Sequence, residues 1–92
     1  MNLRKLAQDC PHCMSCGLEN PNRDMLCLAH SNNLEDGRGF AFKSNDLYGA
    51  YLCDTCHKYV DSGLATREEK RIFHHLAWVK TIRWWIDNKH IG

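Results

Sequence analysis

The feature that most constrains this chain is a pair of C-x-x-C motifs, CMSC at 13–16 and CDTC at 53–56. Zn²⁺ takes four ligands in a tetrahedron, and two cysteines on a tight turn can supply two of them. Glycine suits such a turn, and Gly17 follows the first motif. We therefore predict one structural zinc ion. The ligands we expect are Cys13, Cys16, Cys53 and Cys56.

Other uses of the six cysteines are open from the sequence. Cys10-Pro-His-Cys13 is a third C-x-x-C, so Cys10 could replace Cys13 as a ligand. Disulfides and a redox-active pair are further alternatives. The opening segment MNLRKLAQDC lacks the apolar run of a signal peptide, which favours a reducing cytoplasm and metal binding. Cys27 lies in an apolar segment, where we expect a buried free thiol.

At 92 residues the chain is expected to form one small α+β zinc-stabilised domain spanning 1–92. Short strands are predicted at 25–30 and 47–53, with a polar loop between them. A helix is predicted at 56–63, where Gly63 would end it. These elements form an expected core over residues 10–63. No stretch has the length of a membrane span.

Thr66 and Glu69 form a capping box, which predicts a long C-terminal helix at about 66–88. Apolar residues recur at three- and four-residue steps along it, and aromatic residues widen the apolar face. Two explanations are open: the helix lies across the whole core, or it binds a protein partner or a second copy of the chain. His74 and His75 are expected on its surface or in such an interface. The predicted apolar face comprises Ile72, Leu76, Val79, Ile82 and Ile86.

The net charge of +1 hides an uneven distribution. Residues 1–64 hold six Lys and Arg against eight Asp and Glu, and residues 65–92 hold six against three. This bias permits a phosphate-bearing partner without demanding one. The candidate phosphate contacts are Arg4, Lys5, Arg38, Lys43, Lys58 and the basic residues of the last helix.

His57 and Asp61 lie four residues apart in the predicted 56–63 helix. Side chains at this spacing share one helix face, one turn apart. An imidazole and a carboxylate together could hold Mg²⁺, Mn²⁺, Ni²⁺ or Zn²⁺. The alternative is a histidine packed beside the cysteines and an aspartate that caps the helix.

The order of these motifs resembles that of the HNH endonucleases built on a treble-clef zinc scaffold. The shared pattern is a C-x-x-C, an apolar run that ends at His30, a polar loop with Asn45-Asp46, and a second C-x-x-C followed by His57. A closer resemblance is to the YbcO-like nucleases of lambdoid prophages. It rests on MNLRKLA, Asn20-Pro21, LAH at 28–30, Asp46-Leu47 and the run from Cys53 to Asp61.

The resemblance implies a ββα-metal fold and a function. His30 would be the general base of a metal-dependent endonuclease that hydrolyses DNA. His57 and Asp61 would hold Mg²⁺ or another divalent cation. Asn45 or Asp46 would orient His30 or touch that cation. A phage or prophage protein of this kind would work in the host cytoplasm.

The sequence departs from the HNH pattern at Ala29, where many members carry a metal ligand directly before the base. Either His30 is itself a ligand or the cation keeps more waters. Two other functions therefore stay open. The chain could be a non-catalytic zinc module that binds nucleic acid or protein, or a subunit of a larger phage assembly.

Overall fold

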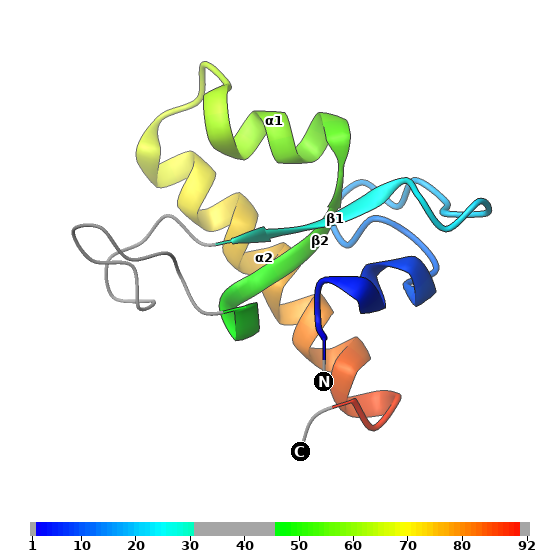
Figure 1. Cartoon of the computed structure of the whole chain (residues 1–92). Helices are drawn as coiled ribbons and strands as arrows, with labels where there is room; N and C mark the ends of the chain where they lie inside the picture. The colour runs from blue at the N-terminus through cyan, green and yellow to red at the C-terminus, as the bar shows by residue number, and fades with distance from the viewer. Residues whose placement is uncertain (1, 31–45, 91–92) are drawn as a thin grey trace.

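The computed structural model describes residues 2–30 and 46–90 as a small α+β domain (Figure 1). Two antiparallel strands lie at the centre, α1 packs on one side of them, and α2 crosses behind them. None of the helices in the described part of the chain is long and apolar enough to cross a bilayer. The elements are η1 (Lys5–Asp9), β1 (Leu26–His30), η3 (Asp46–Tyr48), β2 (Gly49–Cys53), α1 (Asp54–Ser62) and α2 (Arg67–Asp87).

The two strands form the pair that the sequence predicts. Their antiparallel register places Leu26 opposite Cys53 and His30 opposite Gly49. β2 begins later than predicted because residues 46–48 form the 3-10 turn η3. A Cβ on Gly49 would lie 2.5 Å from Cδ1 and 2.6 Å from Cγ of Leu28, so a larger residue here would have to displace the Leu28 side chain. The register thus brings His30 to the end of the sheet where η3 enters it.

Every residue of β2 is buried, although an exposed strand would alternate. The reason is that its outer edge is covered by other elements. The backbone N–H of Tyr51 donates to Thr81 Oγ1 on α2 at 3.2 Å, and the Tyr51 carbonyl accepts from the Met14 N–H at 2.9 Å. One central strand therefore joins the long helix to the cysteine-rich loop.

The core is built around Tyr51 and Trp85, which are both fully buried. Their rings meet edge to face with centroids 5.6 Å apart. Trp85 Nε1–H donates to the Tyr51 hydroxyl at 3.1 Å, and that hydroxyl donates to the Leu3 carbonyl. This network fastens the N-terminal segment and α2 to β2.

α1 and α2 begin and end close to the predicted positions. α1 starts two residues earlier, at Asp54, and the Gly63 N–H donates to the Tyr59 carbonyl at its end. The predicted capping box opens α2: the Glu69 N–H donates to Thr66 Oγ1 at 3.1 Å, and the Thr66 N–H donates to Glu69 Oε1 at 3.0 Å. The predicted end of α1 at Gly63 and the predicted start of α2 at Thr66 are therefore confirmed, whereas the start of α1 is corrected from residue 56 to Asp54.

The predicted apolar face of α2 is wrong for four of its five residues. Ile72, Leu76, Val79 and Ile86 are exposed, and Ile82 is half-buried. The helix instead buries the stripe of His74, Ala77, Thr81 and Trp85. Ala77 and Thr81 are the small residues of this stripe, and Thr81 lies against β2, where its hydroxyl accepts from the Tyr51 N–H.

The prediction for His74 is also wrong. It is buried, not on the surface, and its Nε2 lies 2.8 Å from the Ala29 carbonyl oxygen. His75, the next residue, is exposed as expected and packs against Trp78.

Candidate metal centres

The predicted cysteine cluster forms where two separate segments meet. CMSC at 13–16 lies in the loop after η1, and CDTC at 53–56 joins the end of β2 to the first turn of α1. The ligand atoms of the four residues all lie within 4.8 Å of one another, and the Cys16 and Cys53 sulfurs are 3.6 Å apart. Zn–S bonds of about 2.3 Å in a tetrahedron place sulfurs about 3.8 Å apart, so the donor set fits zinc. The cluster comprises Cys13, Cys16, Cys53 and Cys56.

The backbone around the cluster favours a thiolate at Cys13. Its sulfur accepts from the Ser15 and Cys53 N–H groups, each at 3.4 Å. Burial disfavours the charged form, but these hydrogen bonds, together with those from Cys16, outweigh it and lower the pKa of Cys13 to about 7. Gly17 closes the turn in the left-handed region, at φ 81°, and its N–H donates to the Cys13 carbonyl. A zinc ligand must be deprotonated, so the loop is already arranged for metal.

Of the two cysteines that could have been the zinc ligand, Cys13 lies in the cysteine cluster and Cys10 does not. Cys10 lies outside the cluster, and its Sγ donates to the His12 carbonyl at 3.2 Å. Burial raises the pKa of Cys10 to about 11, so it is a neutral core thiol.

His30 and Asp46 come together at the other end of the sheet. His30 ends β1 and Asp46 begins η3, and His30 Nε2 lies 2.5 Å from Asp46 Oδ1. Arg4 Nε lies 3.5 Å from the same oxygen. The hydrogen bond from His30 is the main reason that the pKa of Asp46 lies below its ordinary value. Asn45, the other residue expected here, lies outside the described residues.

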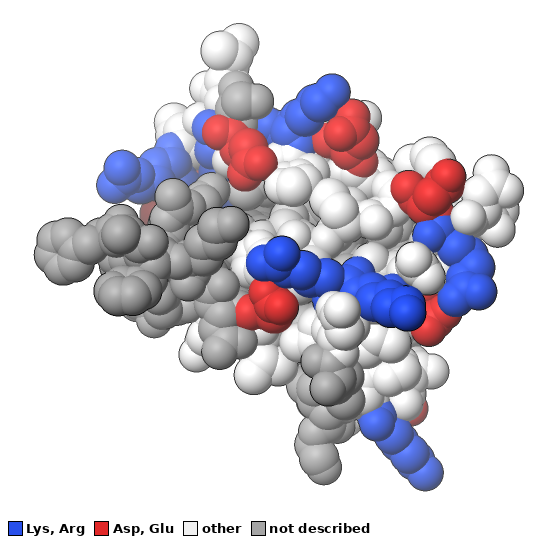
Figure 2. All heavy atoms as spheres, in the orientation of Figure 1, with Lys and Arg blue, Asp and Glu red and all other residues white. Residues whose placement is uncertain are grey.

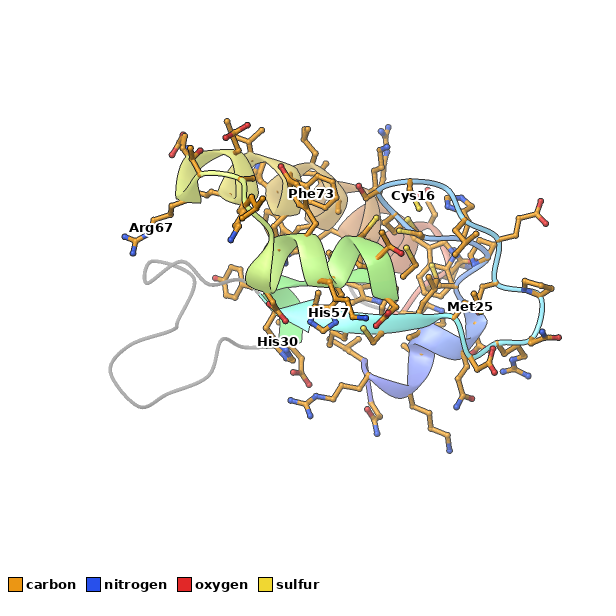
Figure 3. All side chains as sticks on the ribbon, turned by 90° about the horizontal axis from the view of Figure 1, so that it is seen from above. Cys16, Met25, His30, His57, Arg67 and Phe73 are labelled. Carbon is orange, nitrogen blue, oxygen red and sulfur yellow. The ribbon has the colours of Figure 1, made fainter. Side chains whose placement is uncertain are left out.

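His57 and Asp61 also meet, as their spacing on α1 predicts. His57 Nε2 lies 3.0 Å from Asp61 Oδ2. Two ligands about 2.1 Å from an octahedral cation and at right angles to each other lie about 3.0 Å apart, so the pair fits a small divalent ion. Figure 3 shows the His30 and His57 side chains leaving β1 and α1 toward the same side, away from Cys16.

The pair at His57 and Asp61 supplies two protein ligands, and the described residues add no third one. Among the residues that the structure describes, the cysteine cluster is the only group of three or more metal-ligating side chains within 4.8 Å. Ala29 is buried and adds none. A cation at this pair would therefore complete its coordination with water or substrate oxygens.

Cys27 is a neighbour of this site that sequence reasoning missed. It is half-buried, and its sulfur lies 2.9 Å from His57 Nδ1. Residue spacing along β1 gives no sign of this contact, because residues 27 and 30 point to opposite faces of a regular strand. The contact depends on how α1 packs against β1, which only the register of the hairpin could have suggested.

The surface around these sites has mixed charge. On the face drawn in Figure 2, Lys and Arg side chains are interspersed with Asp and Glu. Two of the residues expected to contact phosphate form ion pairs within the protein: Arg4 with Asp46, and Lys58 with Asp54 at 3.0 Å. Arg38 and Lys43 fall outside the described residues. The described part of this face offers no continuous basic stripe.

Comparison of the chain with protein-family models, with curated proteins and with solved structures finds no match in any of the three.

Proposed function

We propose that this protein is a metal-dependent endonuclease that hydrolyses DNA phosphodiester bonds. One observation carries the proposal: two histidine–aspartate pairs lie outside the cysteine cluster. They are His30 with Asp46 at 2.5 Å and His57 with Asp61 at 3.0 Å. A protein that needed zinc for structure alone would need neither pair. The motif order of the HNH endonucleases supports the same function, and a treble-clef scaffold goes with it.

The two metal sites have separate tasks in this proposal. Four cysteines leave zinc no open position, so that site would hold the fold together. His57 and Asp61 would hold a divalent cation such as Mg²⁺. When bound, this cation supplies charge stabilisation at the phosphate and the leaving oxygen.

His30 is the residue we assign to proton removal. Its Nε2 faces Asp46, so Nδ1 is the nitrogen left to take a proton from the attacking water. The Asp46 carboxylate stays ionised, because its pKa is held low, and it can both orient the ring and stabilise the imidazolium that forms. Arg4 Nε lies 3.5 Å from the same Asp46 oxygen and helps to keep the carboxylate in place.

The substrate is proposed as DNA without strong base selectivity, since no element in residues 2–30 or 46–90 suggests base readout. Cytoplasm is the proposed setting, because reduced thiols are needed for the zinc site.

A second candidate is a non-catalytic zinc module that binds a protein partner, another copy of the chain or nucleic acid. The observation that favours it is the exposed aliphatic set on α2: Ile72 at 49%, Leu76 at 59%, Val79 at 43% and Ile86 at 54% exposure.

The two candidates separate in a cleavage assay on supercoiled plasmid. The zinc-loaded protein, washed free of other ions, is supplied with Mg²⁺, Mn²⁺, Ni²⁺ or additional Zn²⁺. The endonuclease predicts nicked product only after an ion is added. Plasmid that is bound but stays supercoiled with every ion would favour the binding module.

A further inference from the structure

The imidazole of His57 is held at both of its nitrogens. Asp61 Oδ2 lies 3.0 Å from Nε2, and the Cys27 sulfur lies 2.9 Å from Nδ1. The carboxylate comes from the same helix, whereas the thiol comes from β1. Figure 3 shows the His57 side chain between α1 and β1, where both partners can reach it. Cys27 has no task in the proposed function so far.

The direction of the Cys27–His57 hydrogen bond follows from counting protons. A thiol has one proton to donate, and the Cys27 thiol donates it to the Leu52 carbonyl across the hairpin at 3.7 Å. Toward His57 the sulfur is therefore an acceptor, and Nδ1 carries the proton that it accepts.

This assignment leaves His57 Nε2 unprotonated and facing a carboxylate oxygen. Two acceptors at 3.0 Å repel each other unless a cation or a proton lies between them. Histidines that bind metal commonly donate their other N–H to a neighbouring acceptor, which fixes the tautomer and the orientation of the ring.

We propose that Cys27 is a positioning residue of the second metal site: its sulfur accepts the His57 Nδ1–H and so directs the Nε2 lone pair at a divalent cation shared with Asp61. The inference rests on the proposed function, because it assumes a cation at this pair. It adds a residue from β1 to a site otherwise built from α1.

The opposite placement of the two protons would give Cys27 a different role. If the thiol donated to Nδ1 and Nε2–H donated to Asp61, the three side chains would form a Cys–His–Asp relay with a nucleophilic sulfur. In the structure the Cys27 thiol instead donates its one proton to the Leu52 carbonyl, so that proton is not directed at Nδ1. This hydrogen bond favours the positioning role.

The test measures cation binding directly. Zinc-loaded protein is titrated with Mn²⁺, and the free ion is followed by electron paramagnetic resonance. Cys27→Ala should weaken Mn²⁺ binding by about 10- to 100-fold, the usual cost of losing such a partner. Cys27→Ser should stay close to wild type, because a hydroxyl can also donate to Leu52 and accept from His57. Cys10→Ala is the matched control: it removes a neutral thiol that does not touch His57.

A second measurement reports the tautomer. Long-range ¹H–¹⁵N correlation spectra of Mg²⁺-saturated protein should show His57 protonated at Nδ1 and not at Nε2. Protonation at Nε2, or unchanged Mn²⁺ affinity in Cys27→Ala, would overturn the inference while leaving the proposed function intact. Failure of wild type to bind Mn²⁺ outside the cysteine cluster would overturn both.

Discussion

His74 Nε2 donates a hydrogen bond to the Ala29 carbonyl oxygen at 2.8 Å, across the interface between α2 and β1. Ala29 and His74 are both buried, so the carbonyl has no access to water as a substitute partner. Ala29 directly precedes His30, and the bond therefore fixes the strand next to the proposed base. A residue of the long helix thus supports the site without contacting it.

Replacing His74 by leucine keeps much of the volume but leaves the Ala29 carbonyl unsatisfied. The expected loss is about 1–3 kcal/mol in the free energy of unfolding. His75→Leu is the matched control, because His75 is exposed and makes no such bond. Guanidinium denaturation of both variants measures the difference, and equal stabilities would contradict the assigned role of His74.

The sequence located α2 correctly and assigned its buried face wrongly. Its start could be predicted because the capping box is local, needing only Thr66 and Glu69. Its buried face could not be predicted from the spacing of apolar residues, because the large aliphatic residues of α2 are not the ones that pack against β2. Thr81 fits because its hydroxyl satisfies the Tyr51 N–H, a demand set by a strand some thirty residues earlier in the chain.

Substitutions at two adjacent residues test which face of α2 is buried. Leu76→Gln should change the free energy of unfolding by no more than about 0.5 kcal/mol, because the side chain is exposed. Ala77→Gln should lower it by about 1–3 kcal/mol, because a larger side chain must enter a packed interface. Denaturation curves that reversed this order would restore the face predicted from the sequence.

The zinc site predicts how metal content depends on each cysteine. Cys53→Ser should lose zinc and unfold, since metal binding and folding are coupled in so small a domain. Cys10→Ser should keep one zinc per chain, because its hydroxyl can still donate to the His12 carbonyl. Elemental analysis of the purified variants measures the zinc bound per chain. Zinc lost from Cys10→Ser and kept by Cys13→Ser would make Cys10 the ligand.

Alkaline pH should destabilise the folded protein. Burial raises the pKa of Cys10 from 9.0 to about 11, and it raises the pKa of Tyr51 from 10.0 to about 12 against an opposing hydrogen bond from Trp85. Both groups ionise more easily once unfolded, so their contribution is complete below about pH 9 and is lost as the pH rises through 11 to 12.

The free energy of unfolding, measured on zinc-loaded protein from neutral to strongly alkaline pH, should therefore fall. The fall should be smaller in Cys10→Ala, which removes one of the two buried groups. A free energy that did not change with pH in wild type would contradict the burial of both groups.

The contacts within the candidate site could be predicted only where both residues lie on one element, because their spacing then decides whether they meet. The link between His57 and Asp61 follows from one helical turn. Residues 30 and 46 were named from the resemblance, but their contact depends on η3 folding back onto β1. Cys27 was expected only as a buried free thiol, and its contact with His57 could not be predicted, because the position of α1 beside β1 is not encoded in any local motif.

The most direct test of the proposed function is single-turnover cleavage of supercoiled plasmid by zinc-loaded protein with Mg²⁺ or Mn²⁺. His30→Ala should slow nicking by about 10²–10⁴-fold, the usual contribution of a general base, with zinc content and folding unchanged. His57→Ala should need far more metal, and His75→Ala should match wild type. Cleavage that persisted unchanged in His30→Ala and His57→Ala, or no cleavage by folded wild type with any divalent ion, would contradict the proposal.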